Sequence, residues 1–319
     1  MVKIVIAAAS SQLANEIIDK LVETKKHKII GLVRKDPSAY RSLPGVTWVQ
    51  TDYQDKAELV RLLQGVETVF SFFPVHFDKG NAIQKRLIDA SVEAGVKRFA
   101  PSEWATGVKL ANATDAMPWY AGKLEVAEYL EQINKDKKVL EYSRFQIGAF
   151  MNYLAHPHKT TNHVSGLTFA FDFSRQKAVA IEGFEDAVLT WTSVQDIAGV
   201  VARAVEYEGE WPAVGGISGS PMTIGQMLKL GESIGKPFEV EWLKLQDLEA
   251  ELQAPQPADA DLDIHNSSPE KLDAFLKWAT RAILVAVTRG AYHISDEWNK
   301  LLPDYKFTQV EDLVREHWA

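Results

Sequence analysis

Strand-like and helix-like segments alternate through the first half of the chain, and this order constrains the fold more than any other feature. Short apolar runs predict strands, and the amphipathic stretches between them predict helices. The predicted strands are Lys3–Ala8, Lys28–Val33, Val46–Gln50, Thr68–Phe73 and Val96–Ala100, and the predicted helices are Gln12–Glu23, Ala57–Leu63 and Ile83–Ala94. Because such alternation builds right-handed βαβ units, it predicts a doubly wound, parallel Rossmann-type α/β sheet.

The second half of the chain is less regular and predicts a smaller α+β part. Ser268 and Pro269 have the chemistry of a helix start, ahead of a long apolar helix reaching Val287. The other elements expected here are helices at Trp119–Asn134, Val194–Tyr207 and Ile224–Ile234, strands at Val139–Phe145, Phe184–Thr190 and Val214–Ser218, and an exposed loop at Ala254–Asp263. We predict a dinucleotide-binding domain over residues 1–150 and a substrate-binding part over 151–319, with some of its elements returning to the Rossmann sheet.

Composition excludes several classes of function. The 35 basic and 43 acidic residues give a formal net charge of −8, which argues against a nucleic-acid partner. The chain has no cysteine, so disulfides, thiolate zinc sites and a cysteine nucleophile are excluded. His156 and His158 have no carboxylate motif beside them, and we expect no metal site. No Gly-x-Ser-x-Gly motif is present to anchor a hydrolase triad.

The chain enters its first predicted strand at once, without the pattern of a signal peptide. No apolar run approaches the roughly 18 residues of a membrane span. We therefore expect a cytoplasmic protein, monomeric or homodimeric, whose partner is a small molecule and neither a membrane nor a nucleic acid.

A doubly wound fold binds its ligand at the carboxyl ends of the strands, which directs attention to the turn at Ala7–Ala14. Dinucleotide sites normally place three glycines in this turn, whereas the first glycine of this chain is Gly31. A helix N-terminus still offers free N–H groups and a positive dipole end to a phosphate. The candidate phosphate contacts are Ala8, Ser10, Ser11, Gln12 and Leu13. The alternatives are a plain turn without a ligand, or a Gln12 side chain that fills the phosphate volume.

The ends of the next two strands bear on the type of dinucleotide. Arg34 and Lys35 follow the second strand, where NAD sites place a carboxylate and NADP sites place an arginine for the 2′-phosphate. This pair favours NADPH over NADH, although solvated loop charges are an equal alternative. Asp52, after the third strand, is a candidate contact on the adenine side.

Several stretches in order resemble one known family. They are GLVRKDP (31–37), GVETVFSF (65–72), EAGVKRFAPSEW (93–104), MPWYAGKLEVAEYL (117–130), YSRFQIGAFMNYL (142–154), WTSVQDIAGVVARAV (191–205) and LLPDYKFTQVEDLV (301–314). The sequence resembles the NmrA-like, isoflavone-reductase-like branch of atypical short-chain dehydrogenases, in its fungal form. This resemblance implies a Rossmann domain with a small C-terminal substrate domain and NADPH-dependent reduction of aromatic or other secondary metabolites. It also implies a regulatory minority that catalyses nothing.

The resemblance also implies roles for particular residues. The family's glycine-rich turn corresponds to Ala7–Ala14, where this chain departs from it, and its phosphate-reading arginine corresponds to Arg34. Its catalytic lysine corresponds to Lys123. The segment Phe72, Phe73, Pro74 and Val75 is expected beside the nicotinamide, and the substrate wall is expected at Trp104, Phe150, Met151, Asn152 and Tyr153.

The candidate acids and bases are Lys123, Tyr120 and His76. Tyr120 and Lys123 lie three residues apart on a predicted helix and so share one face. A lysine that is partly desolvated beside a cationic nicotinamide has a lowered pKa and can donate or orient a proton. The alternative for Lys123 is a solvated surface lysine, and the alternative for His76 is a packing role. For Glu103 we expect a structural ion pair or cap.

Two functions from different classes follow. The first is an NADPH-dependent reductase of a small aromatic or secondary-metabolite carbonyl, imine or conjugated alkene. The second is a protein on the same scaffold that no longer binds the dinucleotide. Its cleft would serve the reaction of a cyclase, dehydratase or isomerase, or it would bind a ligand in a binding or regulatory protein.

Overall fold

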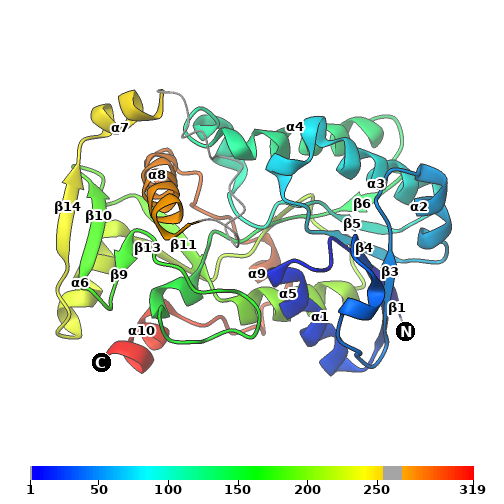
Figure 1. Cartoon of the computed structure of the whole chain (residues 1–319), viewed down its shortest axis with the longest axis horizontal. Helices are drawn as coiled ribbons and strands as arrows, with labels where there is room; N and C mark the ends of the chain where they lie inside the picture. Colours follow the sequence, from blue (N-terminus) through cyan, green and yellow to red (C-terminus); the bar gives the residue numbers. More distant parts are fainter. Residues whose placement is uncertain (1, 254–267) are drawn as a thin grey trace.

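A six-stranded parallel sheet forms the centre of one side of the molecule (Figure 1). The computed structural model describes residues 2–253 and 268–319. The strands are β1 (Val2–Ala7), β2 (His27–Val33), β3 (Val46–Gln50), β4 (Thr68–Ser71), β5 (Arg98–Ala100) and β6 (Glu141–Tyr142), in the order β3-β2-β1-β4-β5-β6. The order reverses between β1 and β4, and this switch point is where doubly wound folds bind ligands. The predicted Rossmann-type sheet is confirmed.

Helices cover both faces of this sheet (Figure 1). One face carries α1 (Gln12–Thr24) and α5 (Val194–Glu206), and the other carries α2 (Lys56–Leu63), α3 (Ala82–Glu93) and α4 (Ala121–Ile133). Alternate residues of β1 serve the two layers, because successive side chains of a strand point to opposite faces. Ile4 and Ile6 pack with the α1 and α5 layer, while Val5 and Ala7 pack with the α2, α3 and α4 layer. Burial of each isoleucine or valine among them contributes roughly 1.5–3 kcal/mol.

The second half of the chain builds smaller sheets around a second core. One sheet has the order β13-β11-β8 and a second has the order β14-β10-β9. The strands are β7 (Arg144–Gln146), β8 (Ala149–Phe150), β9 (Phe171–Asp172), β10 (Lys177–Ile181), β11 (Val188–Thr192), β12 (Val214–Gly216), β13 (Ser220–Thr223) and β14 (Glu239–Leu243), with helices α6 (Ile224–Ser233), α7 (Leu245–Leu252), α8 (Pro269–Thr288), α9 (Glu297–Leu301) and α10 (Val310–Trp318). The domain boundary at residue 150 stays a prediction.

Two predicted strands are wrong in their bounds. The segment Val139–Phe145 divides into β6 and β7, because Ser143 N–H donates to Phe99 whereas Arg144 N–H donates to Ala213 and so changes sheets. The predicted strand Phe184–Thr190 begins too early, since a turn at Gly183 (φ 78°) leaves β11 to start only at Val188. The loop predicted at Ala254–Asp263 lies outside the described residues.

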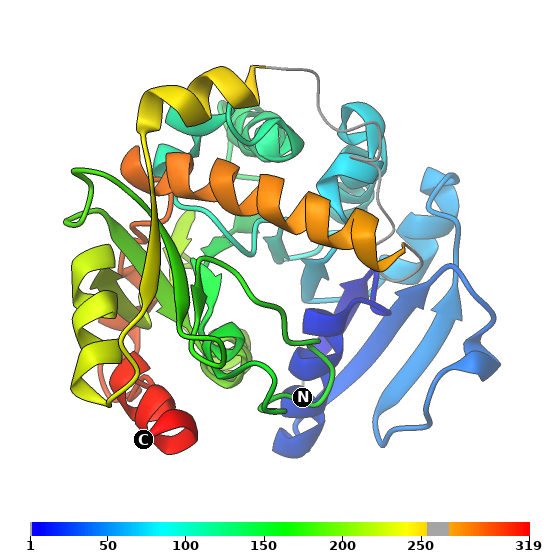
Figure 2. The same ribbon diagram turned by 60° about the vertical axis from the view of Figure 1, so that its left-hand side comes forward.

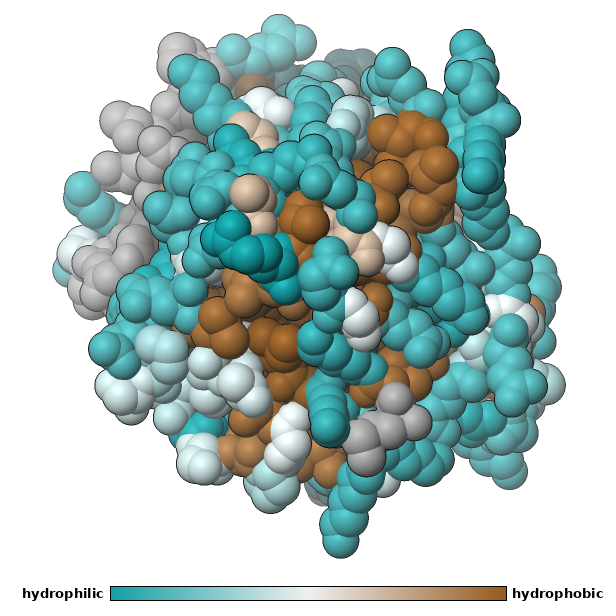
Figure 3. All heavy atoms as spheres, turned by 90° about the vertical axis from the view of Figure 1, so that its right-hand side faces the viewer, coloured by the Kyte–Doolittle hydropathy of each residue, from teal (hydrophilic) through white to brown (hydrophobic). Residues whose placement is uncertain are grey.

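The long helix α8 crosses the middle of the molecule between the two halves (Figure 2). Ser268 Oγ accepts from Lys271 N–H, which confirms the predicted helix start at Pro269. No helix within the described ranges is long and apolar enough to cross a membrane. The face on the side of α2 and β3 is mostly hydrophilic, with apolar side chains gathered across its middle (Figure 3).

Candidate active site

The turn between β1 and α1 is built without glycine but keeps the geometry of an anion cradle. Ala8 adopts a left-handed backbone (φ 53°), and Ser11 caps α1 by accepting from Ala14 N–H at 3.3 Å. Within residues 2–253 and 268–319, the N–H groups of Ser10, Gln12 and Leu13 have no acceptor. Three free donors at the start of a 13-residue helix fit a phosphate group. The residues present therefore fit the dinucleotide that this fold implies.

The two cations expected beside the adenosine ribose of a dinucleotide are exposed and can contact a phosphate. Arg34 and Lys35 follow β2 and are exposed, and neither makes an ion pair with any residue that the structure describes. Asp52, after β3, is also exposed, and its Oδ1 accepts from Gln54 N–H at 2.8 Å. All three residues lie at the same carboxyl edge of the sheet as the turn, since they follow β2 and β3, which run parallel to β1 in the same sheet. Their contacts with a cofactor stay predictions.

The Gln12 side chain is held by another part of the chain. Its Nε2 donates to Ser165 Oγ and its Oε1 accepts from Ser165 N–H, both at 3.0 Å. One turn later, Glu16 Oε1 accepts from His163 N–H at 2.6 Å. A loop from the second half therefore lies along α1, as Figure 2 shows. The Gln12 amide is thus engaged with this loop, while its backbone N–H stays free.

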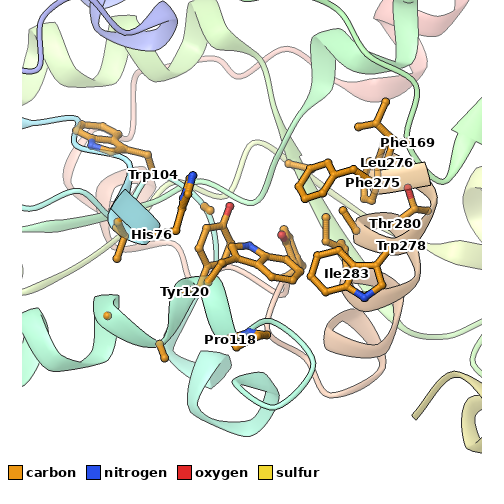
Figure 4. A pocket seen from close by; sticks show the side chains of 18 of the residues that line it. His76, Trp104, Pro118, Tyr120, Phe169, Phe275, Leu276, Trp278, Thr280 and Ile283 are labelled. Atoms are coloured by element: carbon orange, nitrogen blue, oxygen red, sulfur yellow. The ribbon is translucent and has the colours of Figure 1, made fainter. Parts of the chain in front are cut away.

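A cavity of about 680 Å³ opens beside α4 and α8 (Figure 4). It brings together six of the residues predicted from the sequence: Val75, His76, Trp104, Tyr120, Phe150 and Tyr153. Helix α8 supplies a wall that the sequence reasoning missed, made of Phe275, Leu276, Trp278, Ala279, Thr280 and Ile283. An amphipathic helix after a loop gives no sign of which ligand its apolar face covers, so only the packing of α8 revealed this wall.

Six of the residues predicted at the nicotinamide, catalytic and substrate positions do not line the cavity: Phe72, Phe73, Pro74, Lys123, Met151 and Asn152. Met151 is fully buried in the second core, because it begins a short 3-10 helix (Met151–Ala155) that turns its side chain inward, so its place in the substrate wall was wrong. Phe72 is covered by the Trp104 indole, with ring centroids 4.6 Å apart and planes 12° apart. Phe73 packs edge-on against Tyr53. Pro74 is exposed and precedes the 3-10 turn that carries His76.

Lys123 is buried, with 4% of its surface exposed. Its Nζ donates to the backbone oxygen of Glu103 and lies 3.6 Å from the centroid of the Tyr120 ring. Burial lowers the pKa of Lys123 to about 8, although the Glu103 charge acts in the opposite direction. The alternative of a solvated surface lysine is wrong. Nζ sits directly behind the Tyr120 ring, which itself faces the cavity.

Glu103 is also buried, next to this lysine. Burial raises the pKa of its carboxyl group, while the charges of Lys123 and Arg144 and the Gln146 amide favour the ionised form. In place of the expected structural ion pair or cap, Glu103 is a buried acid whose backbone oxygen accepts from Lys123 Nζ.

Two phenols face the cavity without a hydrogen-bond partner in the described part of the chain, Tyr153 and Tyr292. Burial raises the pKa of each hydroxyl, so both stay protonated and can donate to a ligand. Tyr292 was missed by the sequence reasoning because it follows α8, far from every motif. Aromatic walls with a few convergent donors are typical of small-molecule sites.

Comparison with known proteins agrees with this geometry. The NmrA-like family profile matches residues 2–282. The chain is 26% identical over 208 residues to "Oxidoreductase BOA1" of Botryotinia fuckeliana, covering 64% of this chain and 67% of that protein. It is 32% identical over 155 residues to "Oxidoreductase aprR" of Aspergillus flavus, covering 47% of this chain and about half (49%) of that protein.

Solved structures share the whole fold. The NADPH complex of the Escherichia coli quinone oxidoreductase QOR2 aligns with a TM-score of 0.67 at 21% identity, over 98% of this chain and 99% of that one. Isoflavone reductase aligns with a TM-score of 0.66 at 18% identity, over 98% of both chains. The turn, the aromatic cavity and the buried lysine thus lie on a scaffold common to these reductases, and the chain belongs to the NmrA-like family.

Proposed function

We propose that this protein is an NADPH-dependent reductase of a small aromatic or secondary-metabolite carbonyl, imine or conjugated alkene. The observation that carries the proposal is the set of free N–H groups of Ser10, Gln12 and Leu13, at the switch point of the sheet and near two exposed cations. The oxidoreductase names of the relatives and the NADPH-bound neighbour support it.

The first task of these residues is to hold the dinucleotide. The start of α1 would bind the diphosphate through backbone N–H groups, with the Ser10 hydroxyl as a further donor. Arg34 and Lys35 would bind the 2′-phosphate and so select NADPH. When bound, this cofactor supplies hydride.

The second task is to deliver a proton. Lys123 with a pKa of about 8 is mostly a cation at neutral pH, and its Nζ is held by the Glu103 carbonyl oxygen and the Tyr120 ring. In this proposal Lys123 supplies or steers the proton that the reduced substrate acquires. His76 lines the same cavity and is the alternative proton donor.

The third task is to orient an aromatic substrate. Aromatic side chains of α8 and of the 3-10 turn before α4 (Pro118–Tyr120) would stack on a planar molecule. The hydroxyls of Tyr153 and Tyr292 would donate to its oxygen or nitrogen acceptors. A cavity of about 680 Å³ lies within the range of common small-molecule sites.

Titration of the purified protein with NADPH, followed by nicotinamide fluorescence, tests the proposal. We expect saturation in the micromolar range and weaker binding of NADH. Failure to bind at about 1 mM, well above the usual range of cofactor affinities, would remove the reductase assignment and leave the non-redox alternative. The matched control is Arg61→Ala, an exposed arginine on α2, which should leave the titration unchanged.

A further inference from the structure

The turn after β1 holds a conformation that its own sequence disfavours. Ala8 lies in the left-handed region at φ 53°, where a residue with a Cβ atom is strained and where glycine is the usual choice. The free N–H groups of Ser10 and Gln12 follow within four residues, so their directions depend on how Ala8 is held. A contact that stabilises Ala8 therefore also shapes the cradle.

One buried hydroxyl provides that contact. Ala8 N–H donates to the Tyr53 hydroxyl at 2.9 Å, and this hydroxyl donates to the Leu32 carbonyl oxygen, also at 2.9 Å. The Leu32 oxygen accepts in addition from Ala9 N–H at 3.0 Å. A single group thus ties the turn after β1 to the end of β2.

The rest of Tyr53 is fixed as firmly as its hydroxyl. The residue is 1% exposed, and its ring packs edge-on against Phe73 with centroids 4.7 Å apart. Thr51 Oγ1 accepts from Tyr53 N–H at 3.1 Å, and Arg86 donates to the Tyr53 carbonyl oxygen at 2.9 Å. Tyr53 therefore connects the ends of β1, β2, β3 and β4 at the edge of the sheet where the ligand is expected.

We infer that Tyr53 is a positioning residue for dinucleotide binding, whose hydroxyl does for Ala8 what glycine does in the usual turn. The inference rests on the proposed function, because Tyr53 can have this role only if the turn after β1 binds the phosphates of a dinucleotide. Tyr53 itself touches no phosphate: it acts through the backbone of Ala8.

The test compares Tyr53→Phe with the unchanged protein. Loss of the hydroxyl leaves the ring packing in place and removes both hydrogen bonds. We expect the Kd for NADPH, measured by nicotinamide fluorescence, to rise about tenfold. In steady-state assays the KM for NADPH should rise with it, while kcat at saturating NADPH changes less than about twofold, because the reacting atoms are untouched.

A second substitution makes the test specific. Ala8→Gly relieves the left-handed strain directly, so Tyr53→Phe should cost much less in that background, and the double variant should regain most of the NADPH affinity. If Tyr53→Phe alone does not fold, the double variant decides the test: a folded double variant that binds NADPH about as well as Ala8→Gly supports the positioning role, and a double variant that also fails to fold or binds NADPH much more weakly overturns it. Tyr129→Phe is the matched control, since it removes a hydroxyl bound to Asp89 between α3 and α4.

The outcomes separate the two claims. Wild-type protein that binds NADPH, with Tyr53→Phe binding equally well or with no rescue by Ala8→Gly, overturns the positioning role and leaves the proposed function standing. A fall in kcat with an unchanged KM for NADPH also overturns it. Wild-type protein that binds no NADPH overturns both.

Discussion

Replacing Tyr120 by leucine should move the pH profile of the reaction, because the Tyr120 ring stabilises the charged form of Lys123. The Lys123 Nζ lies 3.6 Å from the centroid of the Tyr120 ring, and only 4% of the lysine surface is exposed. A desolvated cation–π contact of this kind is worth about 2 kcal/mol, and about 1.4 kcal/mol corresponds to one pH unit.

The sign follows from the direction of each effect. Burial already lowers the pKa of Lys123 to about 8, so the cationic, proton-donating form predominates below that pH and is lost above it. Removing the ring weakens the cation further. We therefore expect the pH at which kcat/KM falls by half to drop from about 8 by about 1 to 1.5 units in Tyr120→Leu.

The assay is the pH dependence of NADPH oxidation with a single aromatic substrate. Tyr120→Phe is the matched control, because it keeps the ring and removes only the hydroxyl, and its profile should resemble that of the wild type. A Tyr120→Phe variant that loses activity by 100-fold or more, roughly the contribution of a general acid, would identify the Tyr120 hydroxyl as the proton donor. An unchanged or higher pH midpoint in Tyr120→Leu would refute the role of the ring.

Three further predictions follow from separate parts of the structure. Arg34→Ala should weaken NADPH binding by roughly 10- to 100-fold and NADH binding little, as judged by parallel titrations, because only NADPH loses a charge-assisted contact; equal losses would contradict a 2′-phosphate role. Tyr292→Phe should raise the KM of an aromatic ketone substrate by up to about tenfold with kcat little changed, and an unaltered KM would mean that this hydroxyl meets no substrate acceptor. Arg98→Met should destabilise the fold by about 3–5 kcal/mol in urea unfolding, because it removes the buried guanidinium that lies 2.6 Å from Glu141 and that also donates to the Tyr207 and Gly209 carbonyl oxygens. A loss below about 1 kcal/mol would show that these contacts are dispensable.

The sequence by itself determined the layered fold and predicted where the candidate site should lie. Hydrophobic periodicity is local, so the strands and helices of the first half could be predicted closely, and chain order then required a parallel sheet. The Arg34 and Lys123 positions came from motifs, which are also local in the chain. Errors occurred where a strand changes partners, as at Ser143, because a partner strand from distant sequence decides such a change.

Only the tertiary structure decided how the site is assembled. Tyr53 lies 45 residues from Ala8, and no spacing rule links a tyrosine after β3 to a turn after β1. Tyr292 and the α8 wall reach the cavity from more than 100 residues beyond Tyr120 and Lys123, through packing between the two halves of the chain. The lowered pKa of Lys123 likewise arises from burial, which depends on every element packed around it. Contacts of this kind depend on the whole folded chain, and the local pattern of residues in the sequence does not predict them.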